Sequence, residues 1–129
     1  METPRSVIEK HQRAINERDL ETYIETVTFP FTYQNFNGVS ITVNSPKEYG
    51  TTYPAPWETV IAAFPDWLRT DHEHVDEIVS SNLSAVFKVQ AHWITETVQP
   101  HKLITAIWIT VKKNGVWGLQ FRHNLGTID

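Results

Sequence analysis

The chain of 129 residues contains no cysteine and only one methionine. It can therefore form no disulfide, no thiolate zinc site and no cysteine nucleophile. No apolar run approaches the roughly 20 residues that span a bilayer. The first residues carry mixed charge and do not resemble a signal peptide. From these absences we expect a cytoplasmic protein that does not contact a membrane.

Positive charge is also scarce, because 11 Lys and Arg residues stand against 15 Asp and Glu residues. Basic pairs such as Lys112–Lys113 are too sparse to form a phosphate-binding stripe, so we expect no nucleic-acid partner. No glycine-rich phosphate loop is present, and we expect no cofactor. Hydrophobic residues make up 40% of the chain. Length and composition together predict one domain over residues 1–129.

The first half of the chain has the pattern of helices interrupted by a hairpin. Thr3-Pro4 is a typical helix start, and Asp19 predicts the start of a second helix. Apolar residues at helical spacing predict a third helix near 57–64. Asn37-Gly38 predicts a tight hairpin before that helix, because both residues tolerate positive φ.

The pattern of the second half of the chain predicts strands. Approximate spans are 72–80, 83–97, 103–113 and 116–125, with turns at 80–82, 99–102 and 114–115. Helices followed by long antiparallel strands predict an α+β domain.

Three stretches resemble a known superfamily: 29–33 (FPFTY), 71–76 (DHEHVD) and 114–124 (NGVWGLQFRHN). They are similar to the nuclear transport factor 2-like (cystatin-like) superfamily, in particular its SnoaL-like bacterial branch. The resemblance implies a cone in which a strongly bent sheet wraps around three helices, and a homodimer formed through the outer sheet face. It assigns no activity, because this fold carries isomerases, cyclases, dehydratases, epoxide hydrolases and non-catalytic binding proteins.

The turn at Asn114-Gly115 predicts the register of the last two strands. An uninterrupted register places Trp108 opposite Phe121 and Ala106 opposite His123 on the inner face. Arg122 and Asn124 then face outward. A one-residue bulge would reverse this assignment.

Small Ala106 opposite His123 leaves room for a cavity on the inner face. We expect this cavity to bind a small, apolar or planar ligand. The residues predicted to line it are Trp57, Trp67, Trp93, Ala106, Trp108 and Phe121. The alternative is that the aromatic side chains simply fill the core.

An enzyme of the isomerase, cyclase or dehydratase kind is a second hypothesis. It would use His123 as general acid–base and Tyr23 or Tyr33 to polarise the substrate. The strands after residue 80 contain no aspartate and one acid, Glu96. The carboxylate chemistries of the superfamily are therefore not expected. A third hypothesis is a dimerisation or adaptor module without a ligand.

Histidines elsewhere receive simpler interpretations. On an uninterrupted strand His72, His74 and Asp76 would share one face and could hold a metal. Successive side chains along one strand rarely converge, so we expect a solvated strand start and no metal. His11 lies on an apolar helical stripe, which favours a packing role.

Overall fold

The computed structural model describes residues 2–97 and 101–127. Its helices and strands follow one another in the order that the sequence pattern predicts. The helices are α1 (Pro4–Glu17), α2 (Leu20–Glu25), the short 3-10 helix η1 (Pro46–Glu48) and α3 (Pro56–Ala63). The strands are β1 (Val27–Asn35), β2 (Ser40–Val43), β3 (Trp67–Ser80), β4 (Ser84–Thr95), β5 (Lys102–Lys113) and β6 (Val116–Thr127). The turn predicted at 99–102 lies largely outside the described residues.

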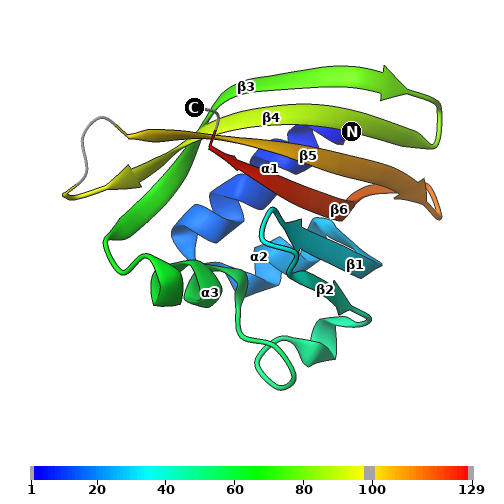
Figure 1. Ribbon diagram of the computed structural model, residues 1–129. Coiled ribbons are helices and arrows are strands. Elements are labelled where there is room, and N and C mark those ends of the chain that lie inside the picture. The colour runs from blue at the N-terminus through cyan, green and yellow to red at the C-terminus, as the bar shows by residue number, and fades with distance from the viewer. Residues whose placement is uncertain (1, 98–100, 128–129) are drawn as a thin grey trace.

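The six strands form one mixed sheet in the order β2-β1-β6-β5-β4-β3. Only the β1–β6 pair is parallel among the described strands. The long strands β3 to β6 curve over α1, and the helices lie on the concave side of the sheet (Figure 1). The opposite face carries no helix of the described chain. This arrangement confirms the predicted α+β fold with three α-helices on a bent sheet.

Local side-chain contacts explain where the first helices begin. The Thr3 hydroxyl oxygen accepts the Ser6 N–H at 3.1 Å, and Ser6 Oγ accepts the Thr3 N–H at 2.8 Å. This reciprocal cap satisfies two otherwise unpaired groups. Asp19 caps α2 in a similar way, because its carboxylate accepts the Thr22 N–H at 3.1 Å. Both helix starts agree with the sequence prediction.

Strand β4 alternates as predicted between a buried and a more exposed face. Ala85, Phe87 and Val89 are at most 2% exposed. The turn after β5 is also as predicted, with Asn114 at φ 54° and Gly115 at φ 78°. From this turn the register runs correctly as far as Thr110 opposite Leu119.

Beyond Leu119 the predicted register of β6 is wrong. Ile109 pairs with Phe121, so Gln120 is an extra residue that forms a one-residue bulge. The strand therefore places Arg122 opposite Trp108, Asn124 opposite Ala106 and His123 opposite Ile107. Arg122 and Asn124 face the helices, whereas Phe121 and His123 lie on the outer face.

The bulge has a physical reason in the double pairing of β6. This strand pairs with β5 on one side and, in parallel, with β1 on the other. The register with β1 also shifts between Val27 and Thr32. Bulges increase local bend and twist, which lets both neighbours stay paired while the sheet curves around the helices.

A further irregularity separates the histidines of β3. The register shifts between His72 and His74, so His72 lies opposite Ala91 while His74 lies opposite Gln90. His72 therefore faces the helices, and His74 shares the outer face with Asp76. The prediction of one shared face for the three side chains was wrong. Among the described residues no group of three His, Asp or Glu side chains is placed to hold a metal ion.

Two apolar clusters make the core. One joins α1 to the sheet and contains Ile8, Phe31, Ala85, Phe87, Val89, Trp108 and Leu119. The other joins the three α-helices to the start of β3 and contains Ala14, Ile15, Tyr23, Ala55, Trp57 and Trp67. In residues 2–97 and 101–127 no helix is long and apolar enough to cross a bilayer.

Gly118 permits the close approach of β1 to β6. A Cβ atom at this position would overlap Thr28 Oγ1 and would lie 3.1 Å from the Thr28 backbone nitrogen. We expect Gly118→Ala to lower the free energy of unfolding by about 1–3 kcal/mol, since overpacking forces the strands apart. Chemical denaturation measures this loss. It should shrink in a Thr28→Ala background, and an undiminished loss there would contradict the contact.

Candidate functional site: a cavity around a half-buried arginine

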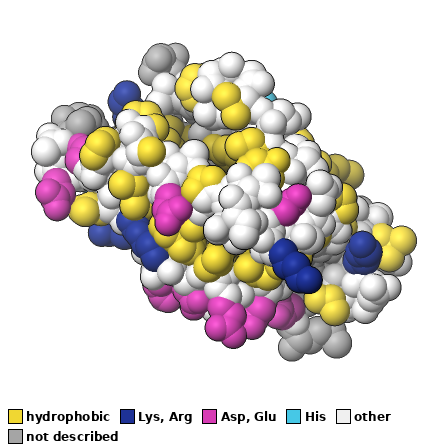
Figure 2. Space-filling model, turned by 90° about the horizontal axis from the view of Figure 1, so that it is seen from below, with side chains coloured by type: hydrophobic (Ala, Val, Ile, Leu, Met, Phe, Trp, Pro, Cys, Tyr) yellow, Lys and Arg dark blue, Asp and Glu magenta, His cyan; other side chains and the backbone are white. Residues whose placement is uncertain are grey.

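A cavity of about 160 Å³ lies on the concave side of the sheet and is partly open to solvent. Its volume is similar to that of an apolar cavity able to hold a benzene ring, about 150 Å³. Side chains from the helices, from all six strands and from the segment between η1 and α3 form the wall. Hydrophobic side chains spread over the face seen from below, with acidic groups gathered along one edge (Figure 2).

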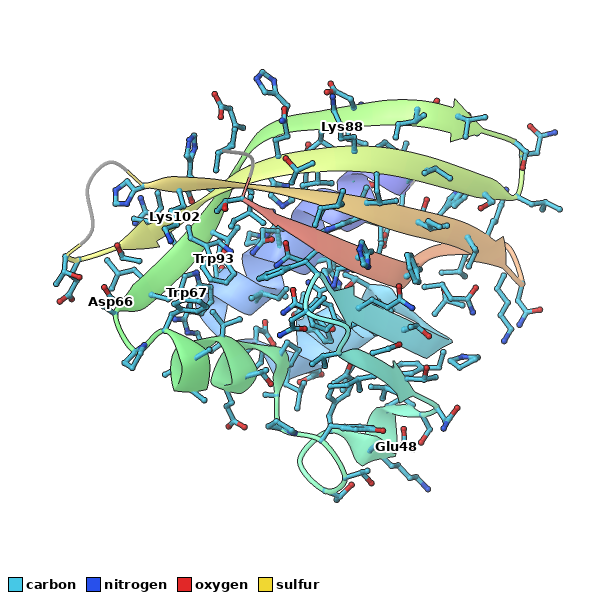
Figure 3. The ribbon with its side chains drawn as sticks, in the orientation of Figure 1. Glu48, Asp66, Trp67, Lys88, Trp93 and Lys102 are labelled. Carbon is cyan, nitrogen blue, oxygen red and sulfur yellow. The ribbon has the colours of Figure 1, made fainter. Side chains whose placement is uncertain are left out.

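The cavity wall includes most of the residues predicted from the sequence. It contains Tyr23, Tyr33, Trp67, Trp93, Ala106 and Trp108. Trp67 and Trp93 lie close together on neighbouring strands (Figure 3).

The other predicted residues lie elsewhere. Trp57 is buried in the core against Trp67 and is not part of the wall. Phe121 and His123 lie on the outer face of the sheet, because the bulge at Gln120 reverses the end of β6. The geometry therefore brings Tyr23 and Tyr33 together but leaves His123 outside.

Arg122 replaces His123 as the ionisable side chain of β6 in the cavity. Its guanidinium carbon lies 5.0 Å from the ring centre of Tyr33, 5.4 Å from that of Trp108 and 5.5 Å from that of Phe31. Each such contact contributes about 0.5–2 kcal/mol by attraction between the cation and the aromatic ring.

Among residues 2–97 and 101–127 no carboxylate forms an ion pair with Arg122. Arg122 Nε is buried and has no hydrogen-bond partner in the described part of the chain. The residues that line the cavity include no Asp or Glu. The aromatic rings hold the guanidinium in place but do not neutralise it, so a net positive charge faces the cavity.

His72 is the histidine that reaches the cavity. Burial, with a smaller contribution from the Arg122 charge, lowers the pKa of His72 to about 4. The ring is therefore neutral near pH 7. Its Nε2 lies 3.1 Å from Gln12 Oε1, and its ring edge contacts Trp108 at a centroid distance of 5.2 Å.

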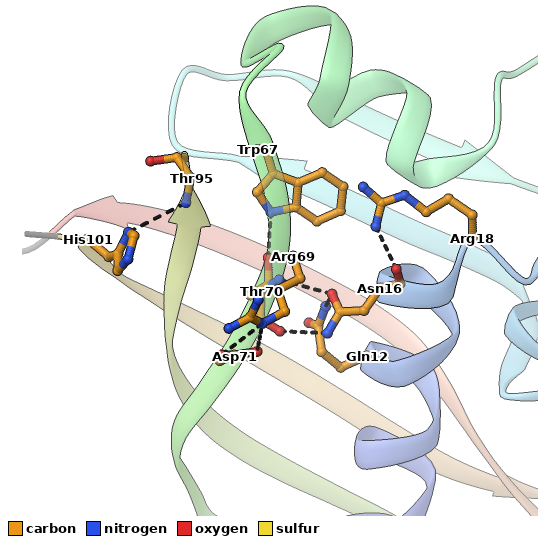
Figure 4. Close-up of polar contacts among 9 residues, drawn as sticks. All are labelled: Gln12, Asn16, Arg18, Trp67, Arg69, Thr70, Asp71, Thr95 and His101. Carbon is orange, nitrogen blue, oxygen red and sulfur yellow. Dashed lines mark hydrogen bonds and ion pairs between the residues drawn. The ribbon is translucent and has the colours of Figure 1, made fainter. Parts of the chain in front are cut away.

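A chain of amides fixes the tautomer of His72. The Asn16 side chain pairs with the backbone of Thr70, since it accepts the Thr70 N–H at 2.9 Å and donates to the Thr70 carbonyl at 2.8 Å (Figure 4). Gln12 Nε2 donates to Asn16 Oδ1 at 3.1 Å. Gln12 Oε1 must then accept from His72 Nε2–H, which leaves the Nδ1 lone pair unprotonated.

Two phenols form a hydroxyl pair at the cavity. The oxygens of Tyr23 and Tyr49 lie 3.3 Å apart. Burial raises the pKa of both phenols, so both stay neutral at physiological pH. One proton joins the two oxygens and the other remains available to a ligand.

His11 lies behind this wall in a packing role, as its spacing predicts. The side chain is fully buried, and its Nδ1 lies 2.8 Å from Thr26 Oγ1. Its ring centre lies 4.5 Å from that of Tyr23. His11 therefore supports one of the cavity phenols, and burial lowers its own pKa well below the usual value.

Comparisons with known proteins identify the fold and nothing finer. No family model matches the sequence, and no curated protein matches it. A nuclear transport factor 2-like protein of unknown function from Pseudomonas putida matches in structure with a TM-score of 0.70 at 13% identity, over 97% of this chain and 84% of that one. A cystatin-like protein from Caulobacter vibrioides matches with a TM-score of 0.69 at 14% identity, over 97% and 87% of the two chains. This chain has the nuclear transport factor 2-like fold.

Other structures with this fold have different descriptions. A candidate ketosteroid isomerase from Shewanella frigidimarina gives a TM-score of 0.71 at 10% identity, over 95% of each chain. A candidate calcium/calmodulin-dependent protein kinase II association domain from Thiobacillus denitrificans gives 0.72 at 15% identity, over 98% and 96% of the two chains. These identities support a shared fold only.

Four residues that line the cavity of this nuclear transport factor 2-like fold were not predicted from the sequence, and the reason can be identified for each. Arg122 and Asn124 need the bulge at Gln120, and the one available signal was the alternative register that the bulge produces. Tyr49 lies between η1 and α3, where no helical or strand periodicity indicates which way its side chain points. His72 was predicted to share a face with His74, and only the shift in β3 separates them.

The lowered histidine pKa values make stability depend on pH. The unfolded chain binds more protons than the folded chain between pH 6.5 and about 4 at His72, so stability falls as the pH drops through this window. We expect His72 to account for about 3 kcal/mol of the loss at its full extent, with Arg122 contributing to the effect and Asp71 opposing it. Buried His11 should add a loss of the same sign.

Denaturant titrations at a series of pH values measure this dependence. His72→Gln removes one titrating group while keeping a polar side chain that can reach Gln12. Its stability should vary less steeply with pH than that of the unaltered protein. Identical slopes would contradict the burial of His72.

Proposed function

We propose that the protein binds a small, planar or largely apolar molecule in the cavity on the concave side of its sheet. The observation that carries this proposal is an aromatic wall around about 160 Å³ of space, into which a few polar groups converge. Such a combination of apolar surface and a small number of polar groups is typical of small-molecule sites.

Small side chains on adjacent strands support a ligand site over a simply filled core. Ala91 on β4 and Ala106 on β5 both line the cavity. They lie opposite Ile104 and Val89 in the β4–β5 register. Larger residues at these two positions would close the space, and an adaptor without a ligand has no need for it.

The geometry does not favour a reaction. A general base works best when its pKa lies near the working pH, whereas the pKa of His72 is about 4. The hydroxyl pair of Tyr23 and Tyr49 would suit a developing oxyanion, as the isomerase hypothesis requires. Without a matched base we propose binding and assign no reaction.

Filling the cavity tests the binding proposal. Ala106→Leu should abolish saturable binding of the neutral planar probes indole and benzamide, because its branched side chain occupies the space they need. Tryptophan fluorescence and isothermal titration calorimetry measure binding. Ala62→Leu on the exposed side of α3 is the matched control and should bind as the unaltered protein does. Equal binding by both variants would place the probes elsewhere.

We also propose that two copies associate through the outer sheet face. Ile107, Ile109 and Phe121 lie on this face and are half-buried, and no described helix covers them. Two structures with this fold, from Thiobacillus denitrificans and Exiguobacterium sibiricum, are candidate association domains. Membership of the SnoaL-like branch and a cytoplasmic location stay predictions of the sequence.

A charge introduced on the outer face tests the dimer. Ile107→Glu should shift the sedimentation coefficient from that of a dimer to that of a monomer, since a carboxylate would be buried without a partner. Ile61→Glu on α3 introduces the same charge on the other side of the molecule and should leave the dimer intact. A monomer at all concentrations of the unaltered protein would refute the proposal.

A further inference from the structure

The positive charge of Arg122 acts on every titratable group around the cavity whose pKa is shifted. It lowers the pKa of His72 on β3 and of His11 on α1. It also acts to lower the pKa of Tyr23 and Tyr49, against the larger opposite effect of burial. These groups lie on four separate segments, so the charge influences pKa values on several sides of the cavity. No carboxylate among the lining residues offsets it.

Most of the other polar groups of the wall can donate a hydrogen bond to a ligand. Asn124 Oδ1 already accepts the Gly126 N–H at 2.8 Å, so its amide Nδ2 is the group left for a ligand. One phenol proton of the Tyr23–Tyr49 pair is also free to donate. Thr70 Oγ1 accepts from Trp67 Nε1 at 3.1 Å, which leaves its own O–H as a donor. An acceptor-rich ligand satisfies these donors better than any donor-rich one.

The charge and the size of the site limit which ligands it can hold. A guanidinium presents a planar fork that matches a carboxylate, and such charge-assisted pairs are about twice as strong as neutral hydrogen bonds. One cation balances one negative charge, whereas a phosphate dianion would remain half unpaired in this apolar surrounding. The space of about 160 Å³ holds one ring or a short branched chain beside the charged group.

We infer that the cavity binds small monocarboxylates, with the carboxylate on the Arg122 guanidinium and a planar or apolar body against Trp108, Trp93 and Trp67. This inference rests on the proposed function and adds the chemical class of the ligand. Trp108 serves two purposes, since its ring contacts the guanidinium and also receives the body of the ligand. Arg122 is then a ligand-binding residue whose natural counter-ion is the ligand itself.

Matched pairs of probes test the charge separately from the cavity. Calorimetric titrations compare benzoate with benzamide, and cyclohexanecarboxylate with cyclohexanecarboxamide, at neutral pH and low salt. We expect each carboxylate to bind about 10- to 100-fold more tightly than its amide, as the loss of a charge-assisted pair implies. Nuclear magnetic resonance titration should show the pKa of His72 rising when benzoate binds, because the nearby positive charge becomes neutralised.

Variants then assign the preference to Arg122. Arg122→Met should bring benzoate affinity down to that of benzamide while benzamide binding persists. Lys88→Gln is the matched control, since it removes one positive charge from an exposed residue of β4 that points away from the helices (Figure 3). It should preserve the preference for carboxylates. If Arg122→Met does not fold, the paired probes and the His72 titration in the unaltered protein decide the question.

The outcomes separate the two proposals. Equal affinities within each probe pair, with binding lost in Ala106→Leu, would overturn the carboxylate inference and leave the cavity as a neutral binding site. Failure of all four probes to bind would overturn both proposals. A carboxylate preference that survives in Arg122→Met would also overturn the inference, because another group would then hold the charge.

Discussion

One extra residue in β6, Gln120, determines which side chains of that strand face the helices. Without it the aromatic ring of Phe121 would lie against Trp108, and the inner face would be closed by apolar packing. With it Arg122 takes that position and Asn124 follows on the same face. The bulge arises because β6 pairs with both β5 and β1 while the sheet bends. The curvature of the fold and the polarity of its cavity therefore share one cause.

The charge that results shapes the surrounding chemistry. Arg122 Nε is buried without a hydrogen-bond partner among the described residues, which is costly, and the rings of Tyr33, Trp108 and Phe31 offset part of that cost. Together with burial it keeps His72 neutral, and it opposes the burial that raises the phenol pKa values. Polar groups that are imperfectly satisfied in an otherwise well-packed domain are typical of binding sites.

Much of the fold was predictable because it depends on local signals. Caps at Thr3 and Asp19 mark helix starts, and the turn at Asn114-Gly115 marks a hairpin. Strand β4 alternates without interruption, so its inner residues were predicted correctly. The cavity was predicted less completely. Tyr23 and Trp108 lie on regular stretches and were found, whereas Arg122 follows one bulge and His72 directly precedes another, and neither was found.

The amino-acid sequence alone determined the α+β order and the absence of acidic residues from the inner faces of the last strands. It also determined that aromatic side chains would dominate the concave side. Only the tertiary structure decided which residues of β3 and β6 turn inward. Side-chain direction in a strand has a period of two, so a single bulge reverses every residue beyond it. That bulge depends on the pairing of strands from distant parts of the chain, so no local sequence pattern predicts it.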